Sequence, residues 1–272
     1  MDKTITYKSS KIFYRIEGKG APIIFIHGFA EDGNIWKHQI EFLQKNFLLI
    51  IPDLPGSGKS INDFSSTQNG KLSTIEFYAA CIKAIVDEEK ISTCIIIGHS
   101  MGGYIALAFA EKYPENLLAF GLFHSSAFAD SDEKKTMRKK SIEFISKHGA
   151  AEFIRQSMPN LFFPIFKEKY PEIIEELIAR YDNFNALSLV SYYEAMMQRP
   201  DRTAVLQNFK KPVLFIIGEK DNAVPLEQSL KQSHLPQISY IHILENAAHM
   251  GMFEETKRVN TLLLSFIKTV VK

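Results

Sequence analysis

Short runs of apolar residues, rich in β-branched side chains, recur along the 272-residue chain and do not alternate with polar residues. Such runs are typical of strands that are buried on both faces of a parallel sheet. We predict strands of this kind at Ile23–Ile26, Phe47–Ile51, Thr93–Ile97, Leu117–Phe123, Pro212–Ile217 and Tyr240–Leu244. Ahead of them, Thr4–Tyr7 and Lys11–Ile16 predict an antiparallel hairpin on one edge of the sheet.

Apolar residues at helical spacing separate these runs. We predict helices at Ile35–Leu43, Thr74–Glu89, Tyr104–Lys112, Pro225–His234 and Glu254–Lys268. At the start of the second of these helices, Ser73 and Glu76 have the spacing of a capping box. Strands that alternate with helices indicate βαβ units, so the sequence predicts the α/β class with a mostly parallel sheet.

Between residues 125 and 199 the alternation stops, because this stretch contains no strand pattern. Helical patterns fill it instead, at Met137–Lys147, Ala151–Met158, Pro171–Tyr181 and Ala186–Gln198. The charged run from Asp130 to Lys140 carries both signs at helical spacing, and we interpret it as a solvated helix face. The stretch is therefore predicted to be helical throughout.

A GxSxG pattern, Gly98-His99-Ser100-Met101-Gly102, follows one predicted strand and precedes a predicted helix. In this context the pattern indicates a sharp strand-to-helix turn that exposes the hydroxyl of Ser100 above the sheet. Glycine on both sides of the serine tolerates the close backbone contacts of such a turn. Ser100 is the predicted nucleophile.

A serine hydroxyl needs a base to remove its proton, and eight histidines compete for that role. His249 is the best candidate, since it lies between the last strand and the last helix, where open α/β sheets gather their functional groups. His124 follows another strand end and could also line a site. The remaining histidines are interpreted as packed or surface residues.

The base needs an acidic partner, and an oxyanion needs two N–H donors. Asp221 also follows a strand end and is the predicted partner, with Glu219 as a local rival and Glu245 as a distant one. The predicted donors are the main-chain N–H groups of Met101, next to the nucleophile, and of Phe29, in the loop after the first buried strand.

The order of these residues decides the domain organisation. Ser100 precedes the helical stretch, whereas Asp221 and His249 follow it. The site can therefore form only when the two flanks come together. We predict a core domain made of residues 1–124 and 200–272, with residues 125–199 inserted as a helical lid.

Composition excludes several classes of function. Apolar residues make up 46% of the chain and charged residues 23%, which is typical of a globular protein rather than of a disordered, collagenous or disulfide-scaffold protein. The formal net charge of +1 gives no attraction to nucleic acid or acidic membranes. No apolar run is long enough to span a membrane, and the N-terminus lacks the apolar core of a signal peptide. We interpret Cys81 and Cys94 as buried thiols of a protein in a reducing compartment, and we therefore expect a cytoplasmic protein.

The sequence favours no cofactor. No metal-ligand motif such as HExxH or a Cys/His cluster occurs. Gly56-Ser57-Gly58-Lys59-Ser60 is similar to the end of a phosphate-binding loop, but Asp53 stands where the complete motif requires glycine. The following stretch, Ile61–Gly70, is polar and turn-rich instead of helical. We expect neither a nucleotide nor a metal site.

The chain resembles the α/β-hydrolase superfamily, specifically its esterase-like members with a cap domain. The matching landmarks are His27-Gly28-Phe29, the run from Asp53 to Ser60, Gly98 to Gly103, Gly218-Glu219-Lys220-Asp221 and Ala248-His249. The resemblance implies an eight-stranded sheet with one antiparallel strand and a helical cap inserted after the sixth strand. Serine at position 100, instead of aspartate, separates the chain from the dehalogenase and epoxide-hydrolase branches. One departure is Asn246-Ala247-Ala248, where many relatives carry a glycine.

These observations predict a cofactor-free serine hydrolase that cleaves a small, largely apolar carboxylic ester through an acyl-enzyme. The same triad would serve a C–C bond hydrolase or a lyase of quinone biosynthesis, both of which need a pocket that recognises an acid. Arg155, Arg199 and Arg202 are candidate carboxylate clamps, with surface arginines as the simpler interpretation. A perhydrolase side activity is a further alternative, and a ligand-binding receptor of the same fold is the alternative from a different class.

Overall fold

The computed structural model describes residues 1–62 and 73–272, and one sheet organises them. Its strands lie in the order β1-β2-β4-β3-β5-β6-β7-β8. They are β1 (Asp2–Tyr7), β2 (Ser10–Glu17), β3 (Pro22–Ile26), β4 (Leu48–Pro52), β5 (Cys94–His99), β6 (Leu117–Phe123), β7 (Val213–Gly218) and β8 (Ser239–Leu244). Within this sheet only β2 runs against the other strands, since its pairs with β1 and β4 are antiparallel and the other pairs are parallel. The predicted eight-stranded, mostly parallel sheet is confirmed.

Burial along the strands explains why most of them could be predicted. Every residue of β5 and β7 is buried, as expected for central strands covered on both faces. The last strand differs, because β8 is an edge strand and Ile241 is 42% exposed. The prediction that Tyr240–Leu244 is buried on both faces is therefore wrong, although the strand itself is present.

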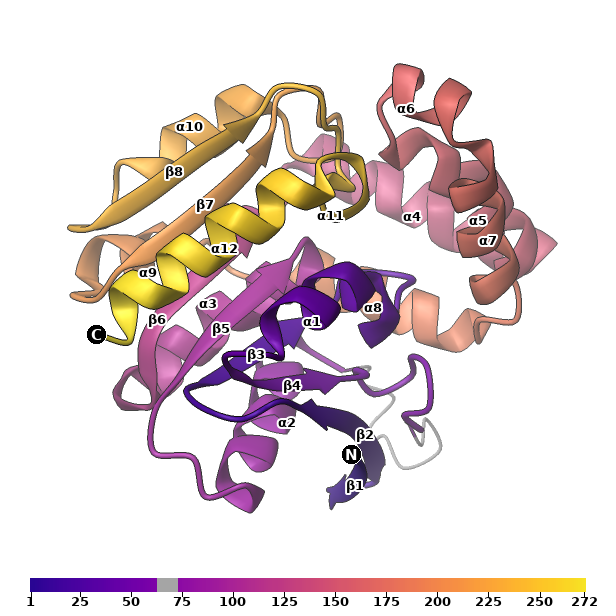
Figure 1. Ribbon diagram of the computed structural model, residues 1–272. Coiled ribbons are helices and arrows are strands. Elements are labelled where there is room, and N and C mark those ends of the chain that lie inside the picture. The colour runs from indigo at the N-terminus through magenta and orange to yellow at the C-terminus, as the bar shows by residue number, and fades with distance from the viewer. Residues whose placement is uncertain (63–72) are drawn as a thin grey trace.

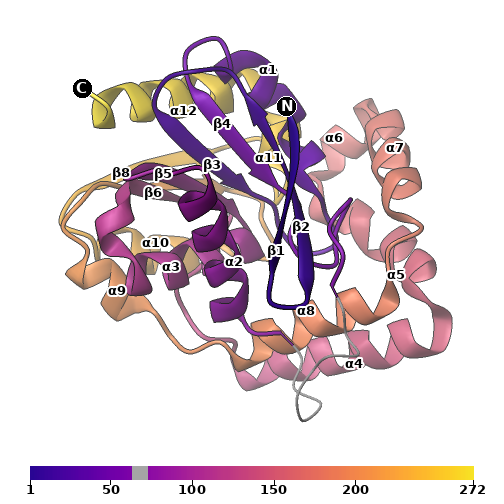
Figure 2. The same cartoon turned by 90° about the horizontal axis from the view of Figure 1, so that it is seen from below.

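Helices cover both faces of the sheet (Figures 1 and 2). One face carries α1 (Lys37–Leu43) and α12 (Thr256–Val270), which contact each other. The opposite face carries α2 (Ile75–Glu88), α3 (Met101–Lys112), α9 (Thr203–Asn208) and α10 (Leu226–Ser233). The sheet between these layers holds the core, which explains why its strands consist of apolar residues without alternation.

The start of α2 differs from its prediction by one residue. Thr74, not Ser73, caps the helix, and its hydroxyl accepts the N–H of Phe77 at 3.2 Å. Glu76 does not complete a capping box, because Phe77 takes the third helical position once Thr74 is the cap. The carboxylate of Glu76 binds the guanidinium of Arg202. A long-range ion pair thus replaces the local contact that the sequence pattern predicted.

Between β6 and β7 the chain forms helices and no strand, and all of these residues are described. The helices are α4 (Asp132–His148), α5 (Ala150–Ser157), α6 (Pro164–Lys169), α7 (Pro171–Tyr181), α8 (Ala186–Gln198) and then α9 on the sheet, with a short 3-10 helix at Met158–Leu161. Figure 1 shows α4 to α7 gathered to one side of the sheet, on the right of the view. That residues 125–199 act as a lid stays a prediction.

The charged run at the start of this stretch is only partly a solvated face. Most residues of α4 are exposed, but Asp130, just before the helix, is 4% exposed. Its carboxylate binds Nε of Arg138 at 2.6 Å and Nη1 of Arg199 at 2.9 Å. The prediction that Asp130 belongs to a solvated face is wrong, because two arginines compensate its charge inside the protein.

Candidate active site

Ser100 lies on a strained turn between β5 and α3. It is the N-cap residue of α3 and has φ 51° and ψ −116°, a left-handed backbone that few side chains adopt. Main-chain bonds hold the turn, since the N–H of Ser100 donates to Phe123 at 2.9 Å and the N–H of Gly103 donates to Ser100 at 2.9 Å. This is the geometry expected of a nucleophile turn.

Glycine is required around Ser100 for a steric reason. A Cβ atom on Gly98 would lie 2.2 Å from the carbonyl oxygen of Gly102, and one on Gly102 would lie 2.5 Å from the carbonyl oxygen of Ile26. Backbone atoms on both sides therefore occupy the space that any side chain would need. The turn can be this tight only because both positions lack a Cβ.

The loop after β3 runs directly beside Ser100. A Cβ atom on Gly28 would lie 3.1 Å from Cβ of Ser100, so Phe29 follows at the edge of the nucleophile turn. His27 stabilises this loop: its Nε2 accepts the N–H of Leu54 at 2.9 Å, which leaves Nδ1–H to donate to the carbonyl oxygen of Gly28 at 2.8 Å. Met101, which follows Ser100, lies in the first turn of α3, where the main-chain N–H groups have no partners within the helix.

Asp221 and His249 form a buried hydrogen-bonded pair. Nδ1 of His249 lies 2.7 Å from Oδ2 of Asp221, and the two residues are 4% exposed each. The other carboxylate oxygen accepts the N–H groups of Ala223 at 2.8 Å and Val224 at 2.9 Å. Burial alone would raise the pKa of Asp221, but the charge of His249 and the hydrogen bonds from His124 and His249 hold it far below its usual range.

His124 also contacts this carboxylate. Its Nδ1 lies 3.4 Å from Oδ2 of Asp221, and its Nε2 accepts the N–H of Gly251 at 3.3 Å. The N–H of Gly218 donates to the same Nδ1 at 3.1 Å, so main-chain donors face both ring nitrogens and a neutral imidazole accepts at least one of them. Burial lowers the pKa of His124 to about 4, which favours this neutral form. The position of His124 at a strand end was the sequence signal for it.

Glu254 holds the main chain around His249. Its Oε2 accepts the N–H groups of Ala248 at 2.9 Å and of Met250 at 3.1 Å. Its Oε1 accepts the N–H of Phe163, which precedes α6, at 2.6 Å. Burial raises the pKa of Glu254 to about 7 in spite of these bonds. Sequence reasoning missed this residue, because it places Glu254 at the start of a helix with no visible link to the loop before it.

The arginines considered as carboxylate clamps are all paired with acidic side chains. Arg155 is exposed and binds Glu152 at 2.7 Å. Arg202 is 3% exposed and its Nε binds Glu111 at 3.0 Å, in addition to its bond with Glu76. Arg199 is 6% exposed and binds Asp130. The interpretation as surface arginines therefore fits Arg155 only.

The turn that resembles a phosphate-binding loop folds around a carboxylate. Oδ2 of Asp53 accepts the N–H of Lys59 at 2.9 Å, and its Oδ1 accepts the N–H of Gly33 at 2.9 Å. Within the turn, the N–H groups of Ser57 and Ser60 donate to main-chain carbonyl oxygens, so these donors also bind the protein itself. The predicted turn-rich stretch Ile61–Gly70 lies, from residue 63 on, outside the described residues.

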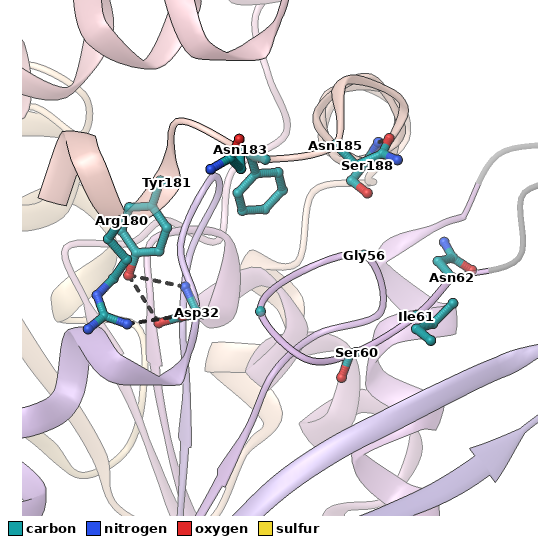
Figure 3. A pocket seen from close by; sticks show the side chains of 12 residues that line it. Asp32, Gly56, Ser60, Ile61, Asn62, Arg180, Tyr181, Asn183, Asn185 and Ser188 are labelled. Atoms are coloured by element: carbon teal, nitrogen blue, oxygen red, sulfur yellow. Dashed lines mark hydrogen bonds and ion pairs between the residues drawn. The ribbon is translucent and has the colours of Figure 1, made fainter.

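A cavity of about 390 Å³ opens beside this turn (Figure 3). It is lined by Gly56 and Gly58 on one side and by the end of α7 on the other, where Tyr181 donates its hydroxyl to Asp32 at 3.1 Å. Ser100, Asp221 and His249 are not among its lining residues.

Within residues 1–62 and 73–272, no group of three or more His, Cys, Asp or Glu side chains has the arrangement of a metal site. Among the same residues, no helix is long and apolar enough to cross a membrane.

Comparison with known proteins supports the fold. A family model described as alpha/beta hydrolase fold matches residues 21–143. The 2-hydroxy-6-oxo-6-phenylhexa-2,4-dienoate hydrolase of Comamonas testosteroni is 26% identical, and the match covers 94% of this chain and 91% of that protein. A thermophilic esterase from Thermogutta terrifontis, solved with malate bound, is 26% identical with a TM-score of 0.91 over 99% of both chains. The enol-lactonase from Burkholderia xenovorans LB400, at 21% identity and a TM-score of 0.88 over 98% of this chain and 100% of that one, shares the fold.

Strand order, nucleophile turn and these similarities agree. The chain has the α/β-hydrolase fold. The proteins similar to it include both an esterase and a hydrolase named for a dienoate substrate.

Proposed function

We propose that the protein is a serine hydrolase that cleaves a small, largely apolar carboxylic ester through a Ser100–His249–Asp221 triad. The observation that carries this proposal is the 2.7 Å bond between His249 and Asp221, together with the left-handed turn at Ser100. A carboxylate on Nδ1 leaves Nε2 of His249 as the free basic nitrogen. The three residues thus have the chemical roles that acyl transfer requires.

In the proposed reaction, Oγ of Ser100 attacks the ester carbonyl carbon while Nε2 of His249 takes the hydroxyl proton. The main-chain N–H groups of Phe29 and Met101 stabilise the negative oxygen that forms. The protonated imidazole then gives its proton to the departing alcohol, which leaves an acyl-enzyme. Water, deprotonated by His249, releases the acid and restores Ser100.

We propose that the helices between β6 and β7 act as the lid and contribute an apolar wall. Aromatic contacts next to the proposed oxyanion site support this role. Phe29 stacks on Tyr193 of α8 with ring centroids 4.2 Å apart, and Phe153 of α5 meets Phe29 edge-on at 6.1 Å. A wall of this kind favours substrates without charge near the reacting bond.

Ester cleavage is favoured over the C–C bond and lyase alternatives by the state of the arginines. A substrate acid needs an unpaired cation, and Arg155, Arg199 and Arg202 each bind a carboxylate of the protein. The similarity to a thermophilic esterase, at 26% identity, supports the same choice. The receptor alternative would leave the strained turn and the buried acid–base pair without a role.

The test is hydrolysis of p-nitrophenyl acetate and butyrate, followed by a panel of amides, lactones and ketones. We expect the wild-type protein to cleave the two esters and Ser100→Ala to lose at least about 1,000-fold in kcat. Ser239→Ala, at the opposite end of β8 from the His249 loop, is the matched control and should keep wild-type rates. Activity should also rise with pH between 5 and 8, because the proposed mechanism requires a neutral imidazole as the base. Equal turnover by wild type and Ser100→Ala would exclude Ser100 as the nucleophile.

We further infer a cytoplasmic location from the two cysteines. Cys81 and Cys94 are both buried and form no disulfide. Burial raises the pKa of both thiols, which keeps them protonated and unreactive. Cell fractionation of the producing organism would test this location directly.

A further inference from the structure

Glu31 is a buried carboxylate that the triad does not use. It lies between β3 and the 3-10 helix at Gly33–Trp36, and it is 2% exposed. Its Oε2 accepts the N–H of Gly28 at 2.6 Å and lies 3.0 Å from Nδ1 of His99. A carboxylate this deep in the protein requires a compensating charge. His99 is the group in position to supply it.

His99 precedes the nucleophile and is fully buried. Its Nδ1 faces the Glu31 carboxylate, and its Nε2 lies 3.0 Å from the main-chain carbonyl oxygen of His249. Both partners are acceptors without a proton to give, so both ring nitrogens must act as donors. Only the doubly protonated, positively charged imidazole meets this condition.

The surroundings of His99 agree with this charge state. Burial alone would lower the pKa of His99, but the charge of Glu31 and its hydrogen bond raise it above the usual value. The pKa of Glu31 is lowered by the same pair despite burial. The other titratable groups around the ring are His249 at 4.9 Å and His124 at 6.1 Å between centroids, and the carboxylate of Asp221. Trp36 and Phe123 close the remaining sides with apolar edges.

The pair connects the three segments that supply the proposed reacting groups. Glu31 binds the main chain of the oxyanion loop at Gly28, and His99 belongs to the nucleophile turn. Through Nε2, His99 also binds the main chain of His249 itself. The positive end of the pair faces His249, because Glu31 lies on the opposite side of the His99 ring.

We propose that the Glu31–His99 ion pair is a positioning element that holds the oxyanion loop and His249 in register with Ser100 and places a positive charge beside His249. The inference rests on the proposed function for its kinetic consequences. In the proposed mechanism the neutral imidazole of His249 is the base, and a positive charge beside that ring disfavours its protonated form. The carboxylate of Asp221 acts in the opposite direction, because it stabilises the protonated imidazole of His249 that forms during the reaction.

The kinetic test uses Glu31→Gln, which keeps the side-chain shape and an acceptor for Gly28 but removes both charges of the pair. We expect kcat for p-nitrophenyl butyrate to fall about tenfold with KM changed less than about twofold. The acid limb of kcat/KM should move up by about 0.5 to 1 pH unit, since the positive charge beside His249 is lost. Glu89→Gln is the matched control: it removes a half-buried carboxylate that binds Lys3 and Tyr14 far from the site.

Superimposable pH profiles for folded Glu31→Gln and wild type would overturn the proposal. An equal shift of the pH profile in Glu89→Gln would also overturn the proposal, because the shift would then reflect general destabilisation of the protein. A shift confined to Glu31→Gln supports the positioning role, since loss of stability alone does not move the pKa of a base.

A second measurement does not depend on hydrolysis or on the folding of a variant. Nitrogen-15 NMR of the histidine rings in the wild-type protein at pH 7.5 reports the protonation of each nitrogen. We expect both nitrogens of His99 to carry protons, whereas a neutral His99 ring would overturn the pair. If no ester is cleaved, the proposed function fails, and this spectrum still decides the charge state of His99.

Discussion

The turn that carries Ser100 and the loop that carries His249 are stabilised in different ways. The turn is held by close main-chain contacts, with the N–H of Ser100 bonded to Phe123 and no room for a Cβ at Gly98. The loop is held largely by side-chain carboxylates, since Glu254 binds the amides on both sides of His249. Packing therefore fixes the nucleophile, whereas ionisable groups add to the main-chain bonds that hold the base. The His249 loop should therefore be sensitive to pH and to substitutions that remove a charge. The Ser100 turn should be sensitive to substitutions that add side-chain volume.

Removal of one carboxylate charge on the base side should have the largest effect. We expect Asp221→Asn to lower kcat by about 10⁴-fold, because an amide can no longer orient His249 and stabilise its charged form. The protein should remain folded, since the amide oxygen can still accept the N–H groups of Ala223 and Val224. Steady-state kinetics and circular dichroism measure the two effects.

Glu219→Gln is the matched control for this substitution. Glu219 follows the same strand and was the rival acid in the sequence, but its carboxylate binds Lys220 at 2.6 Å instead of a histidine. We expect less than about a twofold change in kcat. If Glu219→Gln lost as much kcat as Asp221→Asn, the assignment of Asp221 as the acidic partner of His249 would be wrong.

The next largest effect should come from an added methyl group in the Ser100 turn. Gly98→Ala places a methyl group 2.2 Å from the carbonyl oxygen of Gly102, so backbone must move. We expect the free energy of unfolding to fall by about 3 kcal/mol and kcat by about 100-fold, since the nucleophile shifts with the turn. Gly149→Ala is the control: nothing lies within 4 Å of its Cβ position, although its φ of +86° makes alanine strained. It should lose stability by about 1 to 2 kcal/mol and keep its kcat.

The last prediction concerns how the stability of the protein depends on pH through Glu254. Its pKa is about 7 in the folded protein, against a usual value near 4.5. Between these values the folded state keeps a proton that the unfolded chain releases, so the free energy of unfolding should fall as pH rises from about 4.5 to 7. Urea unfolding of wild type and Glu254→Gln at pH 5 and 7.5 should show a flatter dependence in the variant. Glu245→Gln, exposed on the same loop, should behave like wild type.

Local patterns in the sequence were sufficient to predict the sheet and the residues of the proposed triad. Strands such as β5 and β7 are apolar throughout because both faces are covered, and this leaves a pattern within a few residues. Ser100, Asp221 and His249 each follow a strand end, where an α/β sheet places its reacting groups. Periodicity did not predict α6 and α9, which have six residues each and are too short for a clear helical repeat.

The supporting residues could not be predicted because their partners are distant in sequence. Glu31 appears as one polar residue of a loop, and its partner His99 is 68 positions away. Asp130 stands in a charged run, and only the fold brings Arg199 to it. The same holds for Glu76, whose bond with Arg202 replaces the predicted capping box. Buried charges are recognised by their surroundings, which a single sequence does not display.

The insertion of the five helices α4 to α8 after β6 also has a consequence in time. His249 leaves the ribosome 149 residues after Ser100. At about 5 to 20 residues per second, roughly 7 to 30 s pass during which the growing chain carries a nucleophile without its base. In the proposed mechanism, the nascent protein is therefore inert toward esters until its last two strands and the following loop have been made.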